Sequence, residues 1–189
     1  PEVDQLEREV ESLAIRLLAL RSPMAGDLRE IVAALKITGD LERIGDYASS
    51  IARRSLRIRM PENQISLSGL RSMGRLVQEN LRRSIDAITQ QDSNRAMEVW
   101  HSDRAVDEYY TALFRELVTY MMEDARNIRA CTELLFIAKN LERIGDHATN
   151  VAERVFYAVT GDNLPSLRPR GAPASALTVA ETMQEPDVR

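Results

Sequence analysis

The chain has 189 residues, of which 44% are hydrophobic, 5% aromatic and 29% charged, with a formal net charge of −4. This composition allows a sizeable core, and eight glycines with few aromatic residues favour helices over sheets. The 25 basic residues are scattered among 29 acidic ones, so no basic block indicates a nucleic-acid partner. A single cysteine, Cys131, excludes an internal disulfide, and no apolar run is long enough to span a membrane, which favours a cytosolic protein.

Apolar residues recur every three to four positions in several segments, which is typical of amphipathic helices. In the first of these segments the apolar residues are Val3, Leu6, Val10, Leu13, Leu17 and Leu20. Pro23 ends this pattern, Pro61 ends the next, and Gly161 follows the last as a helix stop. The pattern predicts helices over residues 1–21, 27–59, 67–89, 94–122 and 127–160, with a linker over 61–66.

One segment of the chain occurs twice, 100 residues apart. Leu-Glu-Arg-Ile-Gly-Asp stands at residues 41–46 and again at 141–146. A duplication of this kind indicates two copies of one structural unit. The second copy has three predicted helices and the first has two. We therefore expect an all-α protein, a tandem of two three-helix bundles whose first bundle lacks its N-terminal helix in this chain. The expected domains are residues 1–60 and 66–160, followed by a disordered, proline-rich tail over 161–189.

Aligning the two copies also predicts what precedes the chain. Val3-Asp4 corresponds to Val106-Asp107, so the counterpart of Asp103 would fall one position before Pro1. We expect an aspartate there and an amphipathic helix of about 25 to 40 residues upstream. Without that helix, the apolar stripe of the first bundle should be exposed.

Four carboxylates of the second copy are predicted to converge. Asp103 and Asp107 lie on the helical face that carries Val99 and Val106, and Glu142 and Asp146 have the same four-residue spacing on the next helix. Side chains four residues apart share one face of a helix. Four such charges are costly to crowd together unless arginines, protons or cations neutralise them.

The spacing leaves two interpretations open. The acids could form rim salt bridges with the many arginines, of which Arg43 and Arg143 are the nearest in sequence. Alternatively they bind metal, since carboxylates suit Mg, Ca, Mn or Fe ions, and Zn less well. Gly45 and Gly145 beside the acids each cost about 1 kcal/mol in a helix interior, which implies a close helix approach or room for ions.

The two histidines give little support to other chemistry. Ferritin-type dinuclear oxidases need Glu-x-x-His, and neither His101 nor His147 follows a glutamate by three residues. A phosphoryl-accepting histidine is a further alternative, but neither histidine recurs in the other copy. We interpret both as surface histidines, and Cys131, beside Leu134 and Leu135, as a core residue.

The duplicated hexapeptide resembles the PhoU family. The flanking residues agree, with Pro23 to Arg29 (Pro-Met-Ala-Gly-Asp-Leu-Arg) before the first copy and Tyr120 to Asp124 before the second. The resemblance covers about residues 1–160. It implies a tandem pair of three-helix bundles and a capacity to bind multinuclear iron or zinc clusters, with Mg, Mn and Ca kept open, through E(D)xxxD motifs. Carried over, the motifs give the metal ligands Asp4, Glu42, Asp46, Asp103, Asp107, Glu142 and Asp146.

The resemblance also implies a role. PhoU proteins act as negative regulators of the phosphate-starvation response, coupling a phosphate ABC transporter to a sensor histidine kinase. The implied partners are the transporter ATPase subunit, the membrane kinase and a second copy of the chain, with no nucleic acid. The implied location is the cytoplasm, with access to the inner membrane through partner proteins. The alternative is a carboxylate-bridged, metal-dependent hydrolase or oxidase, which would need an open coordination position and a substrate-sized cleft.

Overall fold

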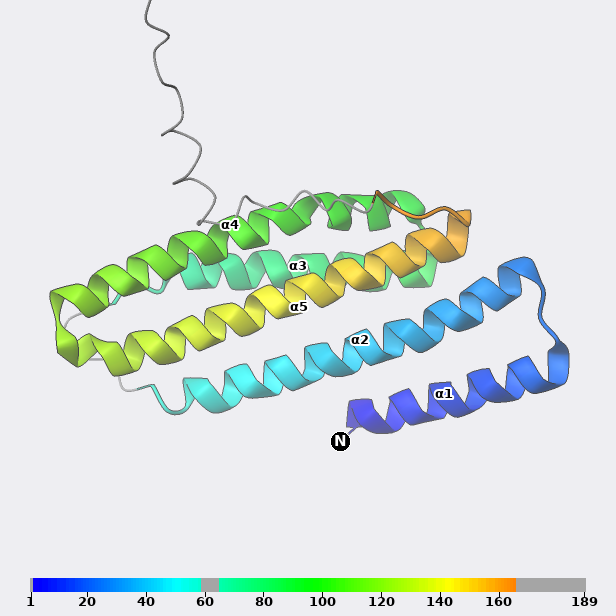
Figure 1. Cartoon of the computed structure of the whole chain (residues 1–189), viewed down its shortest axis with the longest axis horizontal. Coiled ribbons are helices and arrows are strands. Elements are labelled where there is room, and N and C mark those ends of the chain that lie inside the picture. The colour runs from blue at the N-terminus through cyan, green and yellow to red at the C-terminus, as the bar shows by residue number, and fades with distance from the viewer. Residues whose placement is uncertain (1, 59–64, 166–189) are drawn as a thin grey trace, which may run out of the picture.

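The computed structural model describes residues 2–58 and 65–165. Over these residues the chain forms long α-helices joined by short turns and has no strand (Figure 1). This confirms the all-α prediction. The elements are α1 (Glu2–Arg21), α2 (Ala25–Ser55), α3 (Ser68–Gln90), α4 (Ser93–Glu123), a 3-10 turn η1 (Ala125–Asn127) and α5 (Ile128–Thr160).

The helix ends agree with the sequence pattern to within two residues, with one exception. Helix α2 ends at Ser55, four residues before its predicted end at 59. Ile58, after the end of the helix, is partly buried and packs against the buried cluster that includes Leu117, Ala130 and Leu134. The prediction had relied on Pro61 alone as the stop. Residues 59–64, with most of the predicted linker, and residues 166–189 of the predicted tail lie outside the described residues.

Two helix ends show why the chain turns where it does. The Asp92 side chain accepts hydrogen bonds from the backbone N–H groups of Asn94 and Arg95 at 3.0 and 3.1 Å, which caps the N-terminus of α4. At the end of α5, Gly161 has a φ of 81° and donates its N–H to Tyr157 O at 2.9 Å. This left-handed conformation strongly favours glycine, and the predicted helix stop is confirmed.

Helices α3, α4 and α5 form a bundle in which each packs on the other two. Their shared core includes Met73 and Val77 from α3, Val106 from α4, and Ala138 from α5. Each fully buried side chain of Val or Met size contributes roughly 1.5–3 kcal/mol of hydrophobic stabilisation. Cys131 is fully buried, as predicted, and burial raises the pKa of its thiol.

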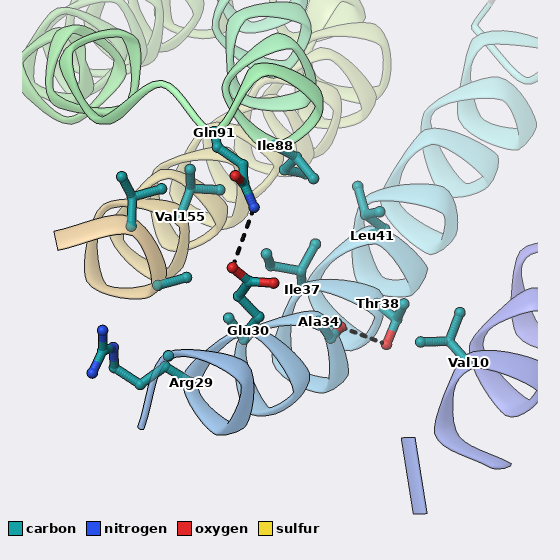
Figure 2. A pocket seen from close by; sticks show the side chains of 14 residues that line it. Val10, Arg29, Glu30, Ala34, Ile37, Thr38, Leu41, Ile88, Gln91 and Val155 are labelled. Atoms are coloured by element: carbon teal, nitrogen blue, oxygen red, sulfur yellow. Dashed lines mark hydrogen bonds between the residues drawn. The ribbon is translucent and has the colours of Figure 1, made fainter. Parts of the chain in front are cut away.

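Helices α1 and α2 pack on each other, and α2 also lies along α5 (Figure 1). An apolar groove of about 560 Å³ runs along α2, between the ends of α3 and α5 and Val10 of α1, and is lined in part by Val10, Thr38 and Leu41 (Figure 2). Their counterparts in the second bundle are Leu113, Ala138 and Leu141, which pack with residues of α3. The described first repeat therefore presents an open face where the second is covered by a helix. Leucines at this edge of α1 are strongly exposed: Leu6 by 54%, Leu13 by 57% and Leu20 by 71%.

The long α2 and α5 helices meet with approximate two-fold symmetry. Asn150 Nδ2 of α5 donates a hydrogen bond to Asp40 Oδ1 of α2 at 3.3 Å. In the reciprocal contact, Asn140 Nδ2 of α5 donates to Ser50 Oγ of α2 at 3.1 Å. Positions 40 and 50 of one repeat thus face positions 150 and 140 of the other, which fixes an antiparallel alignment of the two repeated helices.

Candidate carboxylate site

The carboxylates predicted in the second repeat lie on α4 and α5. Asp103 is 3% exposed, and its Oδ1 accepts a hydrogen bond from Thr149 Oγ1 at 2.9 Å. The same hydroxyl lies 3.1 Å from the backbone oxygen of Gly145. Asp103 is therefore held against α5 by a neutral donor. We call Asp103, Asp107, Glu142 and Asp146 the second carboxylate set.

Glu142 of this set has a cationic neighbour on its own helix. The ammonium of Lys139, one turn earlier on α5, forms an ion pair with Glu142 Oε2, an oxygen that is buried. The Lys139 Nζ atom also lies 5.0 Å from the centre of the Tyr110 ring on α4, within the range of a cation–π interaction. Lys139 thus joins the two helices that carry the second carboxylate set.

A repeated glycine allows the carboxylate-bearing helices to approach each other. A Cβ atom at Gly145 of α5 would lie 3.2 Å from Val106 Cγ1 of α4. A Cβ atom at Gly45 of α2 would lie 3.7 Å from Val3 Cγ2 of α1. The predicted close approach is present in both repeats and is tighter in the second.

The first carboxylate set, Asp4, Glu42 and Asp46, lies on α1 and α2. The pKa of Glu42 is raised above its usual value, mainly because burial disfavours the charged carboxylate. The negative charges of Asp46, Glu7 and Asp4 raise the pKa of Glu42 further. The Arg43 guanidinium, whose Nε lies 3.7 Å from Glu42 Oε2, lowers this pKa but offsets the negative charges only in part. These carboxylates are therefore close enough to repel one another.

Glu7 was missed by the sequence analysis. It occupies the position that Tyr110 holds in the second repeat, so the comparison of the copies gave no signal for a carboxylate there. The spacing of Asp4 and Glu7 on one face of α1 could have indicated it.

The carboxylates differ in how well they fit a hard cation. The acids around Glu42 repel one another, and a bound cation would remove this repulsion. In the second set, Glu142 already has an ion pair with Lys139, and Asp103 already accepts a hydrogen bond from Thr149. Within residues 2–58 and 65–165, no three His, Cys, Asp or Glu side chains are gathered closely enough to hold a metal ion as they stand. The seven predicted ligands stay a prediction.

A polar cluster that the sequence analysis did not identify lies where α2 meets α5. Asp40 is 5% exposed and accepts a 2.7 Å hydrogen bond from Arg154 Nε. His147 Nδ1 lies 2.8 Å from the other Asp40 oxygen, which also accepts the bond from Asn150. His147 had been interpreted as a surface histidine, but it is only 22% exposed in its side chain and takes part in this contact between repeats. The available signal was a polar residue at both 40 and 140, on the same face as Ile37 and Ile44.

The apolar groove lies apart from both carboxylate sets. Arg29, Glu30 and Gln91 are the polar residues at its α2 and α3 ends, and Gln91 Nε2 donates to Glu30 Oε1 at 3.3 Å (Figure 2). None of the seven predicted metal ligands lines it. The groove therefore does not supply a substrate cleft at those carboxylates. None of the helices in the described part of the chain is long and apolar enough to cross a membrane.

Comparison with protein families matches the PhoU domain to residues 1–55 and 70–155. A relative from Caulobacter vibrioides, named as a phosphate-specific transport system accessory protein PhoU homolog, is 53% identical over 169 residues. The match covers 89% of this chain and 74% of the relative. A relative from Zymomonas mobilis with the same name is 49% identical, covering 90% of this chain and 71% of its own length.

Solved structures give the same result. The crystal structure of PhoU from Pseudomonas aeruginosa matches with a TM-score of 0.81 at 40% identity, covering 85% of this chain and 78% of that one. The phosphate transport system regulatory protein PhoU from Streptococcus pneumoniae matches with a TM-score of 0.78 at 32% identity, covering 87% and 77% of the two chains. The sequence resemblance noted in the duplicated hexapeptide therefore extends to the whole described fold.

Proposed function

Because the chain belongs to the PhoU family, we propose that it is an accessory regulator of phosphate transport. The observation that carries this proposal is the family match over both repeats, together with relatives named as accessory proteins of phosphate-specific transport. The finer role that we propose is negative regulation of the phosphate-starvation response. In that role the chain couples a phosphate ABC transporter to a sensor histidine kinase, in the cytoplasm and beside the inner membrane.

An adaptor needs partner surfaces more than a reaction centre. The helices offer long faces, and the apolar groove along α2 contains none of the seven carboxylates. A metal-dependent hydrolase or oxidase would need metal ligands that open into a substrate-sized cleft. This difference favours a non-enzymatic adaptor over the enzyme alternative.

The adaptor proposal is tested with purified partners. The chain, the transporter ATPase subunit and the cytoplasmic part of the sensor kinase from one bacterium are mixed, and complexes are measured by size-exclusion chromatography with light scattering. We expect complexes with the ATPase and with the kinase. If the folded chain associates with neither, the coupling role is wrong.

We also propose that the carboxylate sets bind multinuclear metal, with iron and zinc as the first candidates and Mn, Mg and Ca also to be tested. Support comes from the repulsion around Glu42, which a cation would relieve. Elemental analysis of the purified chain, before and after chelation, measures the metal directly. Replacing Glu142 and Asp146 by alanine should lower metal content and the thermal midpoint if the metal is structural, because a ligand bound only by the native state stabilises it. An unchanged or higher midpoint at unchanged metal content would remove the proposed role of this set.

A further inference from the structure

Helix α3 differs in charge from the other α-helices. It carries four arginines and two acidic residues, which gives it a net charge of +2. By contrast, α1 has five acidic residues against three arginines, and α4 has six against three. Helices α2 and α5 are balanced, with five and four residues of each sign. Among the α-helices of the described residues, α3 is therefore the one with a net positive charge, in a chain whose formal net charge is −4.

Three of the arginines lie along the outer face of α3. Arg71, Arg75 and Arg82, which we call the arginine row, follow one another at intervals of four and seven residues, so they share one side of the helix. All three are exposed, whereas the side of α3 that faces the bundle buries Met73 and Val77. At a rise of about 1.5 Å per residue, the row is about 16 Å long.

The acidic residues of α3 do not neutralise the arginine row. Glu79 forms an ion pair with Arg83 at 2.9 Å, and Asp86 forms one with Arg95 of α4 at 3.4 Å. Within residues 2–58 and 65–165, no member of the row has an ion-pair partner. The row therefore presents three positive charges to the solvent without a nearby counter-charge on its own helix.

The same face has the composition of a protein-binding surface. Gln78 lies between Arg75 and Arg82, and Ile85, which is 42% exposed, follows Arg82 by one turn. Arginines are enriched at protein interfaces, and their planar guanidinium groups bind carboxylates through paired hydrogen bonds. A helix that binds a membrane inserts its apolar side, but the apolar side of α3 is already buried in the bundle. These features favour an acidic protein over a lipid surface.

We infer that the outer face of α3 binds an acidic α-helical segment of a partner protein, whose carboxylates repeat at four and seven residues and meet the arginine row. Such a segment lies lengthwise along α3 and supplies the negative charge that this face lacks. Ile85 contacts an apolar side chain at the end of the segment. The inference rests on the proposed adaptor role, because it assigns a partner-binding surface to that role.

The inference is tested with the transporter ATPase subunit and the cytoplasmic part of the sensor kinase. Arg71→Glu, Arg75→Glu and Arg82→Glu are combined in one variant of the 189-residue chain, and its affinity for each partner is measured by calorimetry. We expect the affinity for at least one partner to fall by about tenfold or more, because attraction becomes repulsion at three positions. Circular dichroism checks that the variant is folded.

The matched control reverses three exposed arginines on other helices. It combines Arg16→Glu of α1, Arg115→Glu of α4 and Arg129→Glu of α5, and it changes the net charge by the same amount. This control should keep the affinity of the unchanged chain for both partners. If the α3 variant loses no more affinity than the control, the inference is wrong.

A peptide separates this inference from the adaptor role. The probe is an alanine-rich helix of about 20 residues with three glutamates at spacings of four and seven, and the control peptide has glutamine at these places. We expect the chain to prefer the glutamate peptide, and the preference to disappear when Arg71→Gln, Arg75→Gln and Arg82→Gln are combined. This milder variant adds no acidic residue to α3, so it also serves if the first variant does not fold.

The outcomes are distinguishable. If the unchanged chain binds neither partner, the adaptor role fails, and the peptides still decide on the α3 face. A chain that shows no preference for the glutamate peptide would then overturn the inference. Vesicles of phosphatidylcholine with and without phosphatidylserine test the other anionic surface. If the arginine row is needed for binding to the phosphatidylserine vesicles but not to the peptide or the partners, the face binds a membrane and the inference is wrong.

Discussion

Gly145 of α5 lies so close to Val106 of α4 that a Cβ atom at the glycine would be 3.2 Å from Val106 Cγ1. The matching distance in the first repeat, from Gly45 to Val3 Cγ2, is 3.7 Å. The glycine of the duplicated hexapeptide thus has less room for a methyl group in the second repeat than in the first.

This difference predicts opposite effects of the same substitution. Gly45→Ala should stabilise the chain by up to about 1 kcal/mol through helix propensity, because 3.7 Å is an ordinary contact. Gly145→Ala should gain nothing or lose about 1 kcal/mol, because overpacking a core costs roughly 1–3 kcal/mol. Urea denaturation of the two variants measures this. A Gly145→Ala variant more stable than Gly45→Ala would contradict the close helix contact.

The Asp40 cluster predicts a large effect from one buried carboxylate. Asp40→Ala removes the hydrogen-bond partner of Arg154, His147 and Asn150, and should destabilise the chain by about 3 kcal/mol. The reciprocal substitution Ser50→Ala removes one neutral bond from Asn140 and should cost about 1 kcal/mol. Chemical denaturation compares the two variants. Equal losses of stability would show that the charged contacts of Asp40 contribute no more to folding than the neutral bond of Ser50.

The raised pKa of Glu42 predicts a pH dependence of stability. The folded state favours the protonated carboxyl, so the stability it provides is complete below the ordinary value of 4.5 and is lost as the pH rises through the folded pKa. In chelator, Glu42→Gln should therefore be more stable than the unchanged chain at pH 7, with the difference disappearing below pH 4.5. Thermal unfolding across this pH range measures it.

The matched control for Glu42 is Glu142→Gln in the second repeat. Glu142 pairs with the Lys139 ammonium, so its neutralisation at pH 7 should lower stability. A Glu42→Gln variant that is less stable than the unchanged chain at pH 7 would mean that the carboxylates around it do not repel one another as the structure indicates.

The exposed leucines of α1 predict association of the chain with itself. Leu13 and Leu20 occupy the positions of Glu116 and Glu123 in the second repeat, and both are more than half exposed. Replacing both by glutamate should lower the self-association measured by analytical ultracentrifugation. The control is Leu56→Glu, at an 88% exposed residue after the end of α2. If the double variant associates as strongly as the unchanged chain, the α1 stripe is not the contact surface.

Much of this fold could be predicted because it depends on local pattern. The apolar period of three to four residues placed the helices, and Gly161 marked the end of α5. The duplication indicated a close helix approach at Gly45 and Gly145, which the structure contains. The apolar period can be read within a single helix, and the duplication can be read by comparing two segments of the sequence.

The missed features are contacts that neither the apolar pattern nor the comparison of the two copies shows. Asp40 could not be paired with Arg154 until α2 and α5 were known to lie antiparallel. Glu7 was hidden because its counterpart, Tyr110, is not acidic. Lys139 was missed because only arginines and metal ions had been considered as partners of the carboxylates. The ion pair with Glu142 depends on side-chain direction within one turn of helix.

The proposed regulatory role is tested most directly in cells. A bacterium lacking its own PhoU protein, with a reporter for phosphate-starvation genes, is supplied with this chain and grown in phosphate-rich medium. The account predicts that the reporter is repressed to the level seen with the native PhoU protein. A reporter that remains fully active while the folded chain accumulates to normal levels would contradict the proposed function.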